Sequence, residues 1–323
     1  MAKGFGYKNL ETKEKVDEKT LFGIASLTKA FAATTLAKIL PENNITLTTP
    51  LSEFMNITFP SKQLNAYATL EDLLSHRTGL VKNNYLRLNQ KFTRRTLHKF
   101  LKDFGILQDF RTGFIYNNVM YGLASFITEL LTNNTWEDAV REQLLWPLGM
   151  NETTFSTIAD FDSLNIAYPY LNFQSKGFQR ISPNFTKKWG ELGGSGAMLS
   201  NALDMTRWMR FLLNKGELDG KRIMNSKTVD DIFKARNYPI SRTTTFIRPN
   251  TPITISNDLY SLGWRKGYLR GFPILTHTGS TWGYKAMLTL FPVQKLEFKT
   301  LSLPRLEHRI RAPVKNMQLL LPS

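Results

Sequence analysis

Apolar residues recur at helical spacing through most of the chain and form short strand-like runs near its end. The predicted helices cover residues 30–40, 68–74, 92–107, 119–131, 136–145 and 201–213. The predicted strands cover residues 259–264, 274–277, 285–291 and 296–303, and residues 3–9 are expected to be the end of another strand. Because helices crowd the middle and strands lie at both ends, we expect an α+β fold. Its antiparallel sheet would be built from both chain ends and flanked by helices, with a mostly helical subdomain inserted.

Local signals define where some of these elements begin. Thr69 followed by Asp72 predicts a capped start for the short helix at 68–74. Ser200 or Asn201 would cap the helix that follows the glycine-rich stretch at 193–196. Loops are expected at residues 11–19 and 45–60, and loops with short strands at 151–190.

The chain is organised around residues 21–40, which contain Ser26 and Lys29. Residues three apart lie on one helix face, so the Lys29 ammonium can reach the Ser26 hydroxyl. A Ser hydroxyl is a poor nucleophile until a neighbour takes its proton. A Lys held among apolar groups has a lowered pKa and can do this. The alternative is a helix-capping Ser beside a solvated Lys.

Composition excludes several classes of site. The 323 residues include no Cys, which rules out disulfides and thiolate metal sites. The four His residues stand far apart, so neither a zinc enzyme nor another cofactor is expected. The net charge of +16 indicates either a solvated basic surface or one that contacts an acidic polymer or an anionic membrane. No nucleic-acid motif accompanies this charge, so nucleic acid is not an expected partner.

Signals for location are few. No apolar run approaches the roughly 20 residues that span a bilayer, and the first ten residues lack the apolar centre of a signal peptide. Five glycosylation sequons favour a secreted, extracellular glycoprotein; they lie at Asn44, Asn56, Asn133, Asn151 and Asn184.

Three motifs with reactive or polar side chains follow one another along the chain. They are Ser26-Leu27-Thr28-Lys29, Tyr116-Asn117-Asn118 and His277-Thr278-Gly279. Their order, spacing and flanks (FGIASLTKAF, LEDLLSHRTGL, YNNVMYGLASFI) resemble the serine β-lactamase and penicillin-binding-protein superfamily. The chain looks most like its class C β-lactamase, esterase and D-aminopeptidase branch, which includes β-lactamase-like proteins of animals. The resemblance runs from about residue 3 to about residue 300.

The resemblance implies a role for each motif residue. Ser26 would attack a carbonyl and become acylated, while Lys29 keeps its proton mobile. Tyr116, if held near two cations, would have a lowered pKa and act first as base and then as acid to the leaving group. Asn118 would hydrogen-bond the substrate or Lys29. The amides of Ser26 and Ser280 would form the oxyanion hole.

His277 departs from the Lys-Thr-Gly of most β-lactamases. With Thr278, Gly279 and Ser280 it would line the substrate site, as in the esterases and animal members. A permanent cation that grips a substrate carboxylate is replaced by a group that titrates near pH 6.5. This favours ester, amide or peptide substrates, small or peptidic, over β-lactams.

The two chain ends depart from the resemblance. The family begins with a helix and a full first strand before the segment matching residues 3–9, and it usually closes with a strand and a long helix. Here, Pro residues between positions 298 and 323 argue against an uninterrupted helix. We therefore expect one β-lactamase-related domain, apparently truncated at both ends. Its α/β part would comprise residues 1–40 and 195–305, its mainly helical part 41–194, and an irregular tail 306–323.

Two alternatives stay open. The first is a catalytic triad of an α/β-hydrolase, whose chain order would fit Ser195, Asp258 and His277. The segment Gly193–Ala197, however, misses the nucleophile-elbow pattern by one residue. The chain could also be a catalytically relaxed binding or extracellular matrix protein that keeps the fold, as in mollusc shell-matrix proteins that bear this domain. Intact Ser26, Lys29 and Tyr116 favour the enzyme.

Overall fold

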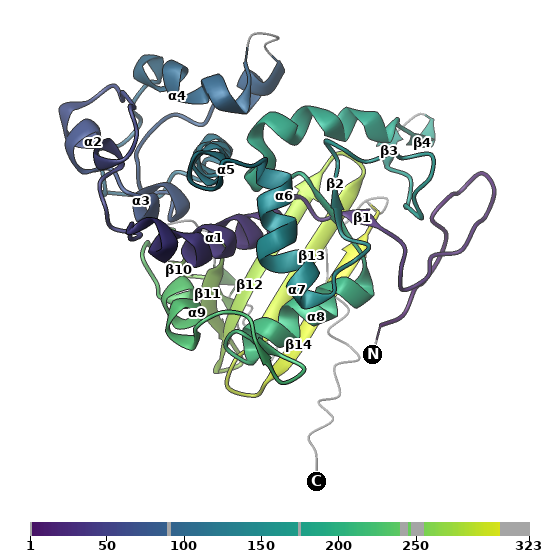
Figure 1. Cartoon of the computed structure of the whole chain (residues 1–323). Coiled ribbons are helices and arrows are strands. Elements are labelled where there is room, and N and C mark those ends of the chain that lie inside the picture. Colours follow the sequence, from purple (N-terminus) through teal and green to yellow (C-terminus); the bar gives the residue numbers. More distant parts are fainter. Residues whose placement is uncertain (1, 89–91, 174–175, 240–244, 247–254, 304–323) are drawn as a thin grey trace.

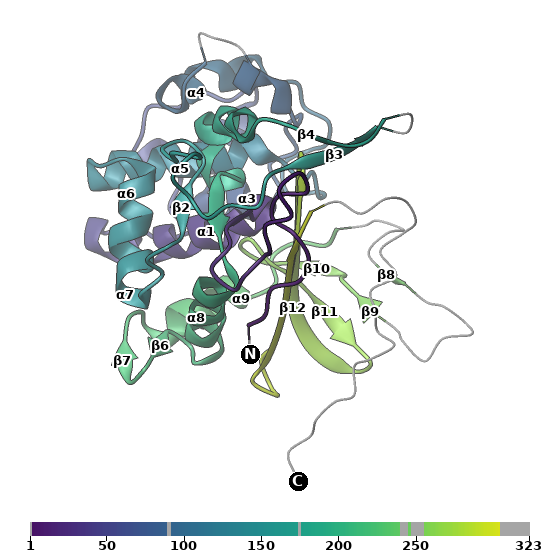
Figure 2. The same cartoon turned by 90° about the vertical axis from the view of Figure 1, so that its right-hand side faces the viewer.

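A large antiparallel sheet from the last third of the chain has the helices of the first two thirds on one side (Figures 1 and 2). The computed structural model describes residues 2–88, 92–173, 176–239, 245–246 and 255–303. The expected tail at 306–323 lies outside the described residues. Within them, the fold is a mixture of helices and antiparallel sheets, as the sequence predicted.

Seven strands form the large sheet in the described part of the chain, in the order β14-β13-β12-β11-β9-β8, with β10 also paired to β11. They are β8 (Thr245–Phe246), β9 (Ile255–Ser256), β10 (Leu259–Tyr260), β11 (Arg265–Leu269), β12 (Phe272–Thr281), β13 (Tyr284–Phe291) and β14 (Leu296–Ser302). Arg270 and Gly271 join β11 to β12 in a two-residue turn, both with positive φ, as the right-handed twist of a hairpin requires. The strands predicted at 274–277, 285–291 and 296–303 are confirmed. Of the strand predicted at 259–264, only β10 at Leu259–Tyr260 is observed, and β8, β9 and β11 were not predicted.

A smaller sheet receives the strand nearest the start of the chain. Its order is β1 (Phe22–Gly23), β5 (Met198–Ser200) and β2 (Thr154–Phe155). The first strand of the described chain thus pairs with β5, and not with a strand of the large sheet. The strand expected at residues 3–9 is wrong, because this segment makes only an isolated bridge between Tyr7 and Lys15. Two hairpins complete the strands: β3 (Tyr170–Phe173) with β4 (Gly177–Arg180), and β6 (Glu217–Leu218) with β7 (Lys221–Arg222).

Most of the observed helices lie where the apolar periodicity predicted a helix, whereas the helices at residues 62–67, 146–148 and 226–233 were not predicted. They are α1 (Thr28–Ile39), α2 (Lys62–Tyr67), α3 (Leu70–Leu74), α4 (Leu97–Phe100), α5 (Asn118–Thr132), α6 (Trp136–Val140), α7 (Trp146–Leu148), α8 (Ala202–Leu213) and α9 (Ser226–Phe233). Tighter 3-10 segments include η1 (Ala25–Leu27) and η8 (Pro183–Ser195). Among the described residues, no helix combines the length and apolar character needed to cross a membrane.

The helix predicted for residues 92–107 is broken into short pieces. The pieces follow one another without a gap from Arg94 to Asp103, so the predicted helix was too long and missed the change to 3-10 geometry at its two ends. Arg94 precedes Leu97 by three residues and lies on the same buried face. Its guanidinium donates to Glu129 Oε1 at 2.7 Å and Glu137 Oε1 at 2.8 Å. The observed pieces are η5 (Arg94–Thr96), α4 and η6 (Leu101–Asp103).

Helix α1 forms the centre of the core. All but one of its residues are buried, so it has no solvent-facing stripe. Phe31 stacks on Trp208 of α8 with ring centroids 4.0 Å apart. Gly263 approaches α1 so closely that an added Cβ would lie 2.8 Å from the Ala30 nitrogen. Helices and sheet therefore meet on α1, and its first turn is held on several sides.

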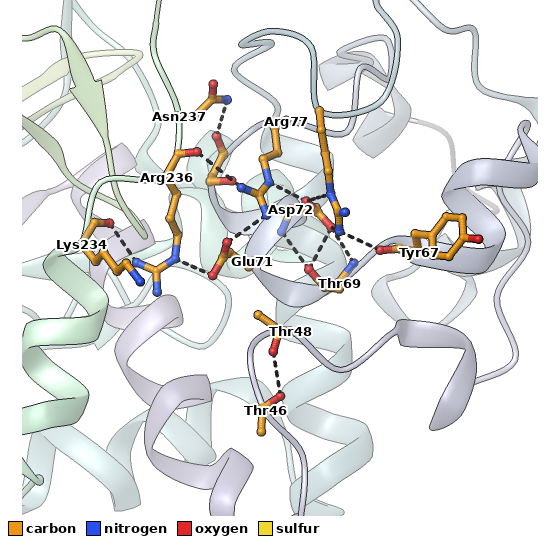
Figure 3. A network of polar contacts seen from close by, with 12 residues as sticks. Thr46, Thr48, Tyr67, Thr69, Glu71, Asp72, Arg77, Lys234, Arg236 and Asn237 are labelled. Carbon is orange, nitrogen blue, oxygen red and sulfur yellow. Dashed lines mark hydrogen bonds and ion pairs between the residues drawn. The ribbon is translucent and has the colours of Figure 1, made fainter.

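A polar network around Asp72 holds the start of the helical region together (Figure 3). Thr69 and Asp72 form the capping box that the sequence predicted for α3. The Asp72 carboxylate also accepts from Arg111 Nη2 at 2.9 Å and from Arg77 Nε at 2.5 Å. Burial alone would raise the pKa of Asp72, but the two guanidinium groups and Thr69 hold it below its usual value.

The same network reaches the sheet. Glu71 Oε2 lies 2.8 Å from Arg236 Nε, and the Arg236 side chain is almost fully buried. The next residue, Asn237, donates to the Ser75 carbonyl at 2.9 Å and exchanges backbone hydrogen bonds with Tyr260 of β10. The end of α3 is therefore tied to β10.

Replacing Asp72 with Asn should destabilise the fold by about 1.5–3 kcal/mol, because the buried side chain loses its charged hydrogen bonds with Arg77 and Arg111, while Arg77 keeps Glu71 and Arg111 is partly exposed. Urea unfolding monitored by circular dichroism measures this. The control is Asp230→Asn, since the exposed pair of Asp230 with Lys215 is worth at most about 1 kcal/mol. Equal loss in both variants would contradict a central role for Asp72.

Candidate active site

Three segments that are far apart in the sequence meet at the start of α1. Ser26 lies in η1, Lys29 in the first turn of α1, Asn118 at the start of α5 and His277 in β12. Tyr116 precedes α5 by two residues. The 3-10 turn packs directly on β12, because a Cβ added to Gly279 would lie 2.2 Å from the Ile24 carbonyl oxygen.

The turn that presents Ser26 is backed by the glycine-rich stretch. Ala25 has φ of 45°, which is uncommon for a residue with a side chain. Behind it, the Gly194 amide donates to Ser125 Oγ at 2.7 Å, and a Cβ at Gly194 would lie 2.5 Å from that oxygen. Ser26 itself stays partly accessible to solvent while its neighbours in η1 are buried.

Lys29 is completely buried and directed at Ser26. Its Nζ lies 3.2 Å from Ser26 Oγ, 2.7 Å from Asn118 Oδ1 and 2.8 Å from the Ser195 carbonyl oxygen. All three partners are uncharged oxygens. Burial therefore lowers the pKa of Lys29 well below 10.5.

Tyr116 lies against Lys29, whose Nζ is 4.7 Å from the centre of the phenol ring. The expected lowering of its pKa is wrong. Burial of the phenol raises the pKa above 10, and this outweighs the opposing effects of a hydrogen bond with Ser26 and of the charge on Arg265. Tyr116 is therefore a neutral phenol, which can donate a proton.

His277 is buried, and both of its ring nitrogens are engaged. Nε2 lies 3.1 Å from the Tyr260 hydroxyl, and Nδ1 lies 2.8 Å from the Thr278 carbonyl oxygen. The expectation of titration near pH 6.5 is wrong, because burial, followed by the charge on Lys29, lowers the pKa of His277 to about 3. His277 is an uncharged hydrogen-bonding group at neutral pH.

The remaining residues of the third motif divide between the two faces of β12. His277 and Gly279 are buried against η1, whereas Thr278 and Ser280 are exposed. The Ser280 hydroxyl accepts a hydrogen bond from Lys285 Nζ. The side chains of Thr278 and Ser280 thus do not join the cluster, and only their backbone runs beside the turn that presents Ser26.

Several residues of the cluster were not foreseen from the sequence. His76 packs against Tyr116 with ring centroids 4.5 Å apart, and Tyr260 holds His277. The guanidinium of Arg265 on β11 lies 5.9 Å from the Tyr260 ring centre, and its buried Nη1 has no hydrogen-bond partner among the described residues. The Ser195 carbonyl contributes through the backbone alone. His76 lies in the LEDLLSHRTGL segment that carries part of the resemblance, but no role was predicted for it, and no motif indicated Tyr260, Arg265 or the Ser195 carbonyl.

The alternative triad of Ser195, Asp258 and His277 is wrong. Ser195 lies at the end of a 3-10 segment, and its hydroxyl is buried without a partner. His277 has no free nitrogen to accept a proton from it, since Tyr260 and Thr278 occupy both. The described residues also hold no group of His, Asp and Glu side chains able to bind a metal ion.

Comparison with known proteins places these features in a family. The Beta-lactamase family model matches residues 1–302. The chain is 27% identical over 315 residues to "Unguisins hydrolase ungD" of Aspergillus violaceofuscus, covering 93% of this chain and 55% of that protein. It is 29% identical over 220 residues to "Gigasin-6" of Magallana gigas, covering 67% of this chain and 72% of that protein. The chain thus spans about half the length of the Aspergillus protein.

Solved structures show the same fold. The octameric penicillin-binding protein homologue from Pyrococcus abyssi superposes with a TM-score of 0.75 at 20% identity, over 93% of this chain and 66% of that one. The D-amino acid amidase from Ochrobactrum anthropi SV3 complexed with D-phenylalanine gives a TM-score of 0.72 at 21% identity, over 92% and 81%. At these identities the likeness concerns the fold alone.

Replacing Gly279 with Ala should displace β12 from the turn that presents Ser26, because the new methyl group would overlap the Ile24 carbonyl. We expect a lower melting temperature, with a cost of about 1–3 kcal/mol. Gly105→Ala is the matched control, since a Cβ there meets no atom within 4 Å. Calorimetry compares the two, and an unchanged melting temperature in Gly279→Ala would refute the close contact.

The free energy of unfolding should fall as the pH drops from about 6.5 toward 3. His277 stays neutral in the folded state down to a pKa of about 3, whereas the unfolded chain takes up the proton near 6.5. In the His277→Asn variant, the free energy of unfolding should depend less steeply on pH, with a slope smaller by up to about 1.4 kcal/mol per pH unit. Urea titrations between pH 4.5 and 7.5 test the slope, and parallel curves would contradict the neutral, buried His277.

Proposed function

The chain belongs to the Beta-lactamase family, and from this premise we propose that it is a serine hydrolase that forms an acyl-enzyme on Ser26. One observation carries the proposal: the buried Lys29 Nζ lies 3.2 Å from the accessible Ser26 hydroxyl. A fully buried lysine without a counter-ion is costly for a scaffold, but it is the form of lysine that can take a proton at neutral pH.

The hydrogen bonds of Lys29 suit a general base. A neutral amine has two N–H groups and one lone pair. Asn118 Oδ1 and the Ser195 carbonyl accept the two N–H groups, so the lone pair is left for the proton of Ser26. As that proton moves to Lys29, the Ser26 oxygen forms a bond to the substrate carbonyl carbon.

Tyr116 would serve the second half of the reaction. As a neutral phenol beside Ser26 and Lys29, it can donate its proton to the leaving oxygen or nitrogen while the acyl–leaving-group bond breaks, and Lys29 returns a proton to it. Water then attacks the acyl group on Ser26, and the same groups carry the proton in reverse. In this proposal Tyr116 acts only as the acid. Lys29 acts as the base, a role that the family resemblance had implied for Tyr116.

The developing oxyanion needs two donors. We assign the backbone amides of Ser26 and Ser280 to this role. Gly279, which has no side chain, lets this part of β12 lie against η1. Each such donor is typically worth about 3 kcal/mol in the transition state.

The substrate class follows from the charge of the third motif. His277 is neutral and hydrogen-bonded to Tyr260, so it offers no permanent cation to a substrate carboxylate. We propose esters and amides, including peptide bonds, as substrates ahead of β-lactams. Two similar proteins, named as a hydrolase of unguisins and a D-amino acid amidase, support this class.

Treating the folded protein with a fluorophosphonate should give one covalent adduct on Ser26, located by peptide mass spectrometry. Ser26→Ala should abolish the adduct and reduce turnover of a p-nitrophenyl ester by on the order of 10⁴-fold or more. The exposed Ser163→Ala is the control and should behave like wild type. A folded wild-type protein with neither adduct nor turnover would favour the alternative, a binding or matrix protein that keeps the fold.

A chromogenic cephalosporin compared with the ester separates the two acyl classes. We expect a higher kcat/KM for the ester, since no fixed cation replaces the lysine of the third motif. A preference for the cephalosporin would overturn the substrate class without affecting Ser26 as the nucleophile.

A further inference from the structure

His76 grips the backbone on both sides of Tyr116. Its carbonyl oxygen accepts from the Ile115 amide at 3.0 Å, and its Nδ1 accepts from the Asn117 amide at 3.1 Å. One residue thus holds the Phe114–Ile115 peptide, which lies one residue before Tyr116, and the Tyr116–Asn117 peptide that directly follows it. Its ring also packs on the phenol, with centroids 4.5 Å apart.

The ring of His76 is held in one state. Because Nδ1 accepts a hydrogen bond, the proton of the neutral imidazole is on Nε2. Burial, with the charge on Arg265 acting in the same direction, keeps the pKa of His76 well below 6.5. The ring is enclosed by aromatic neighbours, with Tyr260 4.9 Å and Tyr121 5.3 Å from it, centroid to centroid.

This arrangement is unfavourable for stability. The Nε2 atom is buried without a hydrogen-bond partner, which typically costs about 1–3 kcal/mol. The backbone of His76 has φ of 62°, a left-handed conformation that adds strain for a residue with a Cβ. Two unfavourable features at one residue, directly against Tyr116, indicate a role other than packing.

We propose that His76 is a positioning residue for Tyr116: its carbonyl and its Nδ1 hold the amides of the two neighbouring residues, Ile115 and Asn117, so that the phenol stays directed at Ser26. This rests on the proposed function, in which Tyr116 transfers a proton. Tyr116 lies outside α5, where no helical hydrogen bonds fix the chain. The side chain of Asn117 adds bonds to the Leu80 and Val81 carbonyls, but these hold the loop and not the tyrosine's flanking amides.

The decisive variants are His76→Asn and His76→Gly. Both residues tolerate a positive φ, so neither adds backbone strain. Asn keeps an acceptor oxygen close to the position of Nδ1, whereas Gly removes the acceptor and the ring. The control is His98→Leu, which removes a His that stacks on Phe126 at 5.1 Å, away from the site.

Kinetics with a p-nitrophenyl ester should show a kcat reduced on the order of 10- to 100-fold in His76→Gly, with KM little changed, because a misaimed phenol slows proton transfer. His76→Asn should stay within about 3-fold of wild type, since its oxygen restores the acceptor. His98→Leu should lower the melting temperature without changing kcat. A merely structural role for His76 would lower stability in the same way and leave kcat unchanged.

Amide hydrogen exchange of the peptide covering residues 113–118 gives a readout that needs no turnover. Exchange should be faster in His76→Gly and near wild type in His76→Asn. If wild type neither turns over the ester nor reacts with a fluorophosphonate, the proposed function fails while exchange still decides whether His76 holds this segment. Folded His76→Gly with wild-type kcat and exchange, or His76→Asn with a loss of 10-fold or more, would overturn the proposal.

Discussion

Lys29 is a primary amine enclosed completely by protein, and its only hydrogen-bond acceptors in the described residues are three uncharged oxygens. An ammonium ion in such surroundings loses its hydration without gaining a counter-ion, so the neutral amine is favoured. Much of the structure serves to keep this group dry. Helix α1 is buried on nearly all sides, and Gly263 and Gly194 let the sheet and the glycine-rich stretch approach it closely.

The electrostatics of the neighbouring groups follow from this burial. The region that excludes water from Lys29 also surrounds His277, His76 and Tyr116, and each is held in its uncharged form. A second charge close to Lys29 would be repelled or would need hydration that the site lacks. Apart from the Arg265 guanidinium beside Tyr260, the cluster is therefore a set of neutral donors and acceptors, suited to moving one proton along a short path.

Much of the fold was predictable because its signals are local. The capping box at Thr69, the apolar run of α5 and the hairpin strands β12 and β13 depend on residues close in sequence. The helix predicted for residues 92–107 is shorter in the structure, and the burial of Arg94 was not predictable because its carboxylate partners come from other segments. The grouping of Ser26, Lys29, Tyr116 and Asn118 was predictable from spaced motifs, although their protonation states were not.

The sequence by itself determined the identities and order of the reactive groups, since Ser26 and Lys29 fall one helical turn apart and the other motifs follow at family-like positions. It could not determine how deeply each group would be buried, and burial sets the pKa. Tertiary structure alone decided that Tyr116 is a neutral phenol, that His277 is an uncharged partner of Tyr260, and that His76 lies behind the tyrosine. The physical reason is that desolvation depends on the protein packed around a group in three dimensions, and that packing comes from segments far away along the chain.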